Sequence, residues 1–129
     1  MTKKKILIVD DEEIMRGFLC DLLEDSGYEV DQSRSGEEAL EFIKQKKYDL
    51  VITDIKMQGK DGYDVLKEVK KIYPDIKVLL MTGYALDEDG VSSISKGANG
   101  FILKPFDINS IREITHRLLN ETKDENFSC

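Results

Sequence analysis

The chain has 129 residues, of which 40% are hydrophobic, and this is enough for one domain with one core. Its 26 acidic residues outnumber its 19 basic residues, so the formal net charge is −7, which disfavours direct binding to nucleic acid. The apolar run at residues 6–9 is too short for a secretory signal, and no segment approaches the roughly 20 apolar residues of a membrane span. We therefore expect a cytoplasmic protein without membrane contact.

The first third of the chain alternates between strand and helix patterns. Residues 5–9 and 28–32 predict strands, and Ser35 is expected to cap a helix that runs to about Lys46. Between the two strands, residues 12–25 predict a helix. Its apolar face is expected to carry Ile14, Met15, Phe18, Leu19, Leu22 and Leu23.

The same alternation continues to the end of the chain. Residues 48–53, 76–81 and 100–103 predict three more strands, because each is a short apolar run. Residues 61–73 predict a helix that Pro74 stops. Two further helices are expected. One is weak, at residues 87–96, and the other is terminal and carries Ile108, Ile111, Ile114, Leu118 and Leu119.

Five strands and five helices in strict alternation predict an α/β fold, a five-stranded parallel sheet with helices on both faces. Residues 1–122 form the expected domain, and the polar residues 123–129 are expected to be a disordered tail. In such a sheet, ligands bind beyond the carboxyl ends of the strands. The residues at those ends therefore become the candidate site.

Charged and hydroxyl side chains follow four of the five predicted strands. The first strand runs into Asp10, Asp11 and Glu12, and the third runs into Asp54. Thr82 and Lys104 follow the fourth and fifth strands. Carboxylates gathered at one edge repel one another, so either some hold protons or a cation lies among them. Exposed hard oxygen ligands suit Mg²⁺, although any one of these acids alone could simply cap a helix.

The loop after the first strand reads VDDEE, which would repel a nucleotide phosphate. The chain contains neither GxxxxGK[ST] nor GxGxxG, so a bound nucleotide or flavin is not expected. An acidic site with a metal suits a carboxylate that itself accepts a phosphoryl group.

Four motifs resemble the receiver domain of two-component response regulators: ILIVDDEE, VITDIKMQGKDG, LLMTGYA and GANGFILKPF. The resemblance implies a flavodoxin-like (βα)5 fold with strand order 2-1-3-4-5. It implies that Asp54 is the phosphoacceptor. It also implies that Asp10 and Asp11 hold Mg²⁺ with Asp54 and the backbone carbonyl of Lys56, and that Lys104 pairs with the phosphoryl oxygens.

The resemblance gives roles to five further positions. Thr82 would bond the phosphoryl group, and Phe101 would turn inward on activation. Pro105 would follow a cis peptide bond, as is usual in the family. Gly59 and Gly62 would let the chain reverse into the next helix.

The implied function is a phosphorylation-dependent signalling switch and not an enzyme beyond self-phosphotransfer and autodephosphorylation. A histidine kinase or histidine phosphotransfer domain would supply the phosphoryl group. A downstream protein or a covalently linked output domain would read the face made by the helix at residues 87–96, the strand at residues 100–103 and the terminal helix, and phosphorylation could drive a homodimer.

Two alternatives remain open at this point. A metal-dependent phosphohydrolase with an aspartate nucleophile usually carries DxDx[TV] after its first strand, where this chain reads DDEEI. A degenerate receiver would act only as a binding module, and it is disfavoured because every residue of the implied site is present: Asp10, Asp11, Asp54, Thr82 and Lys104.

Overall fold

The structure is a computed structural model that describes residues 3–83 and 97–120. The strands are β1 (Lys5–Val9), β2 (Glu29–Ser33), β3 (Leu50–Asp54), β4 (Lys77–Thr82) and β5 (Gly100–Leu103). The helices are α1 (Glu13–Asp25), α2 (Gly36–Gln45), α3 (Gly62–Ile72) and α5 (Ile108–Asn120). The helix predicted at residues 87–96 and the tail predicted at residues 123–129 lie outside the described residues.

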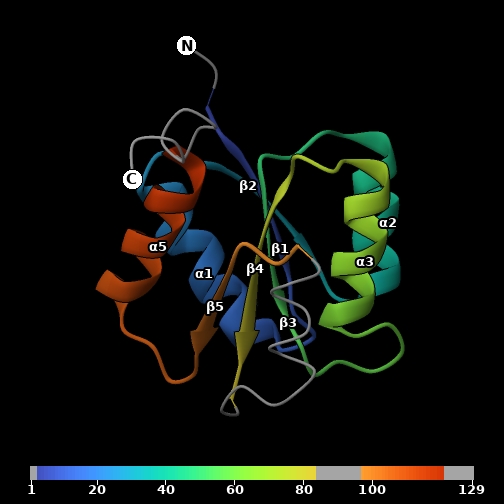
Figure 1. Cartoon of the computed structure of the whole chain (residues 1–129). Helices are drawn as coiled ribbons and strands as arrows, with labels where there is room; N and C mark the ends of the chain where they lie inside the picture. The colour runs from blue at the N-terminus through green and yellow to red at the C-terminus, as the bar shows by residue number, and fades with distance from the viewer. Residues whose placement is uncertain (1–2, 84–96, 121–129) are drawn as a thin grey trace.

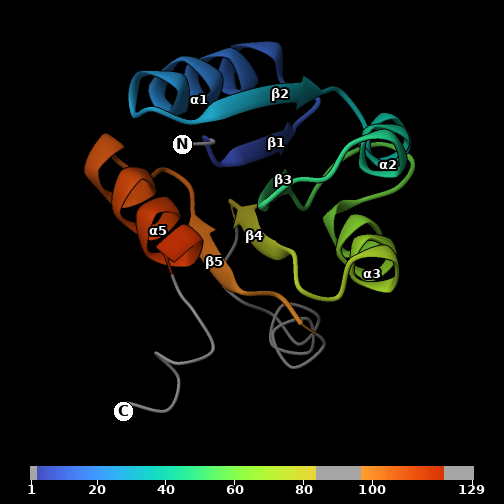
Figure 2. The same ribbon diagram turned by 90° about the horizontal axis from the view of Figure 1, so that it is seen from above.

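All strand pairs are parallel, and the sheet order is β2-β1-β3-β4-β5, as the family resemblance implied. Helices α1 and α5 cover one face of the sheet, and α2 and α3 cover the other (Figures 1 and 2). The carboxyl ends of the strands share one edge, the lower edge in Figure 1. The predicted α/β architecture is therefore confirmed for the part of the chain that the structure describes.

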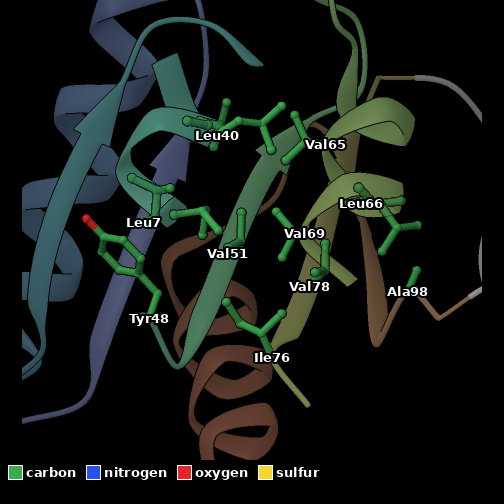
Figure 3. Close-up of a cluster of buried hydrophobic side chains, with 14 of the residues drawn as sticks. Leu7, Leu40, Tyr48, Val51, Val65, Leu66, Val69, Ile76, Val78 and Ala98 are labelled. Atoms are coloured by element: carbon green, nitrogen blue, oxygen red, sulfur yellow. The ribbon is translucent and has the colours of Figure 1, made fainter. Parts of the chain in front are cut away.

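A separate apolar cluster fills each side of the sheet. Figure 3 shows the cluster between the sheet and helices α2 and α3, where Val51 and Val78 of the strands meet Val65 and Val69 of α3. The cluster on the α1 and α5 side includes Ile8, Ile52, Leu19 and Ile111. Strand β3 contributes to both clusters, and all five of its residues are buried, as expected for the central strand of a sheet covered on both faces.

Two helices on the same side begin at side-chain caps that the sequence contains. The Ser35 hydroxyl accepts a hydrogen bond from the Glu38 N–H at 3.1 Å, which confirms the predicted cap of α2. At α3, the side chains of Asp61 and Asp64 each accept from the other's N–H at 3.0 Å, so both free amides are satisfied. These caps fix where the loops from the carboxyl ends of β2 and β3 enter their helices.

The apolar face of α1 was predicted wrongly in part. Ile14 is 88% exposed and Phe18 is 42% exposed, whereas Arg16 and Cys20 are buried. The helix is rotated toward Arg16 because that guanidinium finds hydrogen-bond acceptors beneath the helix, at the Asp10 carbonyl and at Gln32. A pattern that counts only apolar residues misses a buried arginine that polar atoms satisfy.

Candidate functional site

The acidic edge of the sheet is built by the ends of its strands. Asp10 directly follows β1, and Asp54 is the last residue of β3, paired in register with Met81 of β4. Thr82 ends β4, and Lys104 follows β5. The carboxyl ends of parallel strands lie at the same edge of a sheet, so these four residues reach that edge from different parts of the sequence.

Three carboxylates gather there. Asp10, Glu12 and Asp54 each offer an oxygen within 4.8 Å of the others, and we call this group, together with Lys104, the acidic site. Asp10 is fully buried and Asp54 is 6% exposed, whereas Glu12 is exposed. Asp11, which the family resemblance implied as a metal ligand, is exposed and does not join this group.

Lys104 is the cation of the acidic site. Its Nζ lies 3.4 Å from Asp54 Oδ1 and 4.0 Å from Glu12 Oε1, and its side chain is 19% exposed. An ammonium at that distance offsets part of the repulsion between the carboxylates. It also places positive charge beside a carboxylate oxygen of Asp54 at the end of β3.

Burial changes the acidity of both inner carboxyls. The pKa of Asp10 is raised to about 6, mainly by desolvation and in smaller part by the nearby Asp54. Desolvation also raises the pKa of Asp54, and Lys104 opposes that rise. Because both groups lie in low dielectric with one shared cation, the site favours the binding of added positive charge.

The donor set fits Mg²⁺. Asp10 Oδ1 accepts a hydrogen bond from the Glu12 N–H at 2.9 Å, but Asp10 Oδ2 is buried without a hydrogen-bond partner in the part of the chain that the structure describes. A buried carboxylate oxygen without a partner is costly unless a cation or water satisfies it. The residues that could hold the ion are Asp10, Glu12 and Asp54, all through hard oxygen atoms.

The loop after β3 depends on two glycines. Gly59 has φ +75°, and an added Cβ there would lie 2.7 Å from Glu37 Oε2. Gly62 packs against the main chain at the end of β3, because an added Cβ there would lie 2.6 Å from the Asp54 carbonyl oxygen. Gly62 therefore serves close approach and is not part of the turn itself. Lys56 is an exposed residue of the loop after β3. That its backbone carbonyl is a metal ligand stays a prediction.

Strand β5 joins the site through backbone contacts. The Lys104 N–H donates to the Thr82 carbonyl at 2.7 Å, so the two residues are fixed next to each other. Thr82 is buried, and Phe101 is half-buried and packs against the α2–α3 cluster. The Lys104–Pro105 peptide is cis, as the family resemblance implied.

The sequence also matches a family of known proteins. The model of the response regulator receiver domain matches residues 6–116. The chain belongs to this family. The fold and the strand order described above are thus those of a receiver domain.

Two relatives illustrate the range of the family. The chain is 37% identical over 119 residues to the sporulation initiation phosphotransferase F of Bacillus subtilis, covering 92% of this chain and 96% of that protein. It is 35% identical over 122 residues to the transcriptional regulatory protein ZraR of Salmonella typhimurium, covering 95% of this chain. The chain spans only 28% of the length of ZraR.

Solved structures agree with the fold. A CheY-like receiver domain protein from Methanospirillum hungatei superposes with a TM-score of 0.91 at 33% identity, covering 96% of this chain and 99% of that one. The response regulator TrrA from Thermotoga maritima, solved in complex with Mg(2+)-BeF, superposes with a TM-score of 0.81 at 38% identity, covering 89% and 98%. In the described part of the receiver domain, no helix is both long enough and apolar enough to cross a bilayer.

The interpretation of the sequence missed two residues of this edge. Glu12 was seen as an acid after the first strand but was not assigned to the metal site, although its carboxylate reaches Asp10, Asp54 and Lys104. Arg16 was not singled out, yet it is buried and hydrogen-bonded to the Asp10 carbonyl. An arginine one turn into a helix, directly after an acidic strand end, was the signal that could have found it.

Proposed function

We propose that this receiver domain is a phosphoacceptor switch of a two-component phosphorelay, in which Asp54 accepts a phosphoryl group. The observation that carries the proposal is the 3.4 Å approach of Lys104 Nζ to Asp54 Oδ1 at the end of the most buried strand. A carboxylate in that position lies at the edge of the sheet where a donor could approach, and an ammonium lies where phosphoryl oxygens would come.

The chemistry needs little covalent help from the protein. A carboxylate oxygen of Asp54 attacks phosphorus, a new O–P bond forms, and the bond to the donor's leaving atom breaks, with the leaving group keeping the electron pair. Lys104 then neutralises a phosphoryl oxygen. Mg²⁺, held by Asp10, Asp54 and Glu12 or Asp11 with the Lys56 carbonyl, would supply charge neutralisation of the phosphoryl oxygens. Water later cleaves the aspartyl phosphate and regenerates Asp54 with release of inorganic phosphate.

The readout would pass through Thr82 and Phe101. The Thr82 hydroxyl would donate to the phosphoryl group, and Phe101, half-buried in this structure, would turn further inward. The surface altered in this way would be made by the helix expected at residues 87–96, β5 and α5. The first of these three lies outside the residues that the structure describes.

The relatives support the kinds of partner expected. One is named a phosphotransferase and another a transcriptional regulatory protein, and TrrA was solved with Mg(2+)-BeF. We infer a cytoplasmic histidine kinase or histidine phosphotransfer domain as the donor for a receiver that covers residues 1–122. Downstream we infer a protein partner, a covalently linked output domain or a homodimer.

The test uses the purified chain, Mg²⁺ and a small-molecule phosphodonor such as acetyl phosphate, with intact mass as the readout. The expected result is the gain of one phosphate that hydroxylamine removes, because hydroxylamine cleaves acyl phosphates. Asp54→Asn and a chelator should each abolish the gain, while the control Asp75→Asn, an exposed acid away from the acidic edge, should keep it. No gain in the wild type would favour the degenerate receiver, and steady hydrolysis of a phosphate ester would favour the phosphohydrolase.

A further inference from the structure

Arg16 is the only basic residue that is buried in the ranges 3–83 and 97–120, with 9% of its surface exposed. It lies just after the first turn of α1, close to the end of the helix where the dipole disfavours a cation. Burial of a charged side chain is also unfavourable unless hydrogen bonds satisfy it. A residue that breaks both local rules indicates a role in the site next to it.

The contacts of Arg16 go to neutral groups. Nη1 donates to the Asp10 carbonyl at 2.8 Å, and Nε donates to Gln32 Oε1 at 3.2 Å. Among residues 3–83 and 97–120, no carboxylate oxygen lies within 4.0 Å of a guanidinium nitrogen of Arg16, which is the limit for an ion pair. The planar fork therefore connects the end of β1 to the end of β2, which a lysine ammonium could not do with the same geometry.

The Asp10 peptide is held from both sides as a result. Its N–H donates to the Ser33 carbonyl at 3.2 Å, and its carbonyl accepts from Arg16. The side chain is held in turn, because Oδ1 accepts from the Glu12 N–H while Oδ2 has no partner among the described residues. The direction of Oδ2 is thus set by the backbone that Arg16 fixes.

We propose that Arg16 is a positioning residue for Mg²⁺: its fork fixes the Asp10 peptide between β1 and β2 so that Asp10 Oδ2 is presented to the ion. The inference rests on the proposed function, because it takes the acidic site to be the magnesium site. Arg16 touches neither the ion nor the phosphoryl group and acts through Asp10.

The hydrogen bonds of Arg16 and its positive charge are expected to have opposite effects on the affinity for Mg²⁺. The guanidinium repels Mg²⁺, so removal of its charge alone would tighten binding. Loss of the fork frees the Asp10 peptide and weakens binding, and residues that orient metal ligands from behind are typically worth about 10- to 100-fold in affinity. The two roles therefore predict opposite changes, and a variant that keeps the charge without the fork separates them.

The experiment titrates Mg²⁺ alone into the unphosphorylated chain and follows amide chemical shifts in Arg16→Lys, Arg16→Met and the control Arg34→Met. The side chain of Arg34 is 76% exposed, so its variant should bind as the wild type does. Both Arg16 variants should weaken binding, by about tenfold. Gln32→Leu, which removes the partner of Nε and leaves Arg16 in place, should weaken binding in the same direction.

Each other outcome overturns the proposal. Wild-type affinity in Arg16→Lys with tighter binding in Arg16→Met would show a role of charge alone. Unchanged affinity in all variants, with a lower free energy of unfolding measured in a chelator, would show a purely structural role. If Arg16→Met does not fold, Arg16→Lys and Gln32→Leu decide. A wild-type chain that does not bind Mg²⁺ at all would overturn the proposed function together with the role of Arg16. If the wild type binds Mg²⁺ and only the variants behave otherwise than expected, the role of Arg16 fails alone.

Discussion

Two clusters of this molecule each place a lysine near an aspartate, but they satisfy the aspartate to different degrees. In the first, on the edge strand, Asp31 accepts hydrogen bonds from Tyr48 Oη at 2.6 Å and from Lys46 Nζ at 3.0 Å, and we call these three residues the edge cluster. In the acidic site, Asp10 Oδ2 has no partner in the described residues, and Lys104 is shared by two carboxylates.

The difference appears in the acidity of the two carboxyls. Burial raises the pKa of both, but for Asp31 the bonds from Tyr48 and Lys46 outweigh burial, and its pKa is lowered. For Asp10, burial prevails and the pKa rises to about 6. The edge cluster therefore stabilises the fold at neutral pH, whereas the acidic site destabilises the fold and attracts a cation.

The largest effect is expected where the acidic site depends on the main chain. Gly62→Ala places a Cβ 2.6 Å from the Asp54 carbonyl oxygen, so β3 or α3 must move. We expect a loss of about 3 kcal/mol in the free energy of unfolding by urea denaturation, together with lost phosphorylation. Gly17→Ala is the matched control, since a Cβ there meets no atom within 4 Å and should stabilise helix α1 slightly.

The next effect separates the two aspartates directly. Without Mg²⁺ at pH 8, Asp10→Asn should raise the free energy of unfolding by about 2 kcal/mol, because it removes an ionised carboxylate from a desolvated position. Asp31→Asn should lower the free energy of unfolding. Added Mg²⁺ should raise the melting temperature of the wild type but not of Asp10→Asn. A loss of stability in Asp10→Asn would contradict the contrast between the clusters.

The pH dependence should have opposite signs. The folded pKa of Asp10, about 6, lies above its ordinary value of 3.8, so its contribution favours the fold at low pH and is lost as pH rises through 6. The lowered pKa of Asp31 gives a contribution that is present above its ordinary value and is lost as pH falls below it. Denaturation of each Asn variant against wild type from pH 3 to 8 should show these two slopes.

A smaller effect is expected within the edge cluster. Tyr48→Phe keeps the buried ring but removes the hydroxyl that donates to Asp31, so stability should fall by about 1 kcal/mol. The pKa of Asp31 should rise toward its ordinary value, which a carboxyl NMR titration would measure. An unchanged pKa would show that the neighbouring lysines, Lys46 and Lys5, hold the pKa of Asp31 low without the tyrosine.

The smallest effect is expected at the solvent side of the same cluster. Glu29 lies 3.8 Å from Lys46 Nζ and 3.9 Å from Lys5 Nζ, and its side chain is 48% exposed. Glu29→Gln should change the free energy of unfolding by less than about 0.5 kcal/mol, because water and salt screen such pairs. A larger loss would mean that the edge cluster extends further than its three residues.

The fold could be predicted well from the sequence, because strands buried on both faces appear as short continuous apolar runs. Continuous apolar runs such as residues 6–9 are typical of buried strands in an alternating α/β pattern. Among the residues that the structure describes, the predicted elements were found with ends shifted by at most two residues. Asp54 was expected after the third strand and lies within it, because backbone pairing continues to Met81 beyond the last apolar residue.

The site was less accessible to sequence reasoning, because its details depend on side-chain direction. Whether Asp11 or Glu12 turns toward Asp54 depends on how the chain leaves β1, and neither spacing nor polarity encodes this. The exposed Ile14 and buried Arg16 were missed for a related reason. Apolar periodicity predicts which residues avoid water, but not which charged residue finds acceptors beneath a helix.

The position of Asp54 in the central strand also has a consequence for dynamics. The Ile55 N–H, one residue past the end of β3, donates to the Met81 carbonyl at 3.0 Å, and all five residues of β3 are buried. Hydrogen exchange of that amide should therefore require global unfolding, while the loop amides at residues 56–60 exchange through local opening. The carboxylate proposed to accept the phosphoryl group would then lie in the part of the molecule that opens most slowly. A signal that begins there would move the groups around Asp54 and not the strand that carries it.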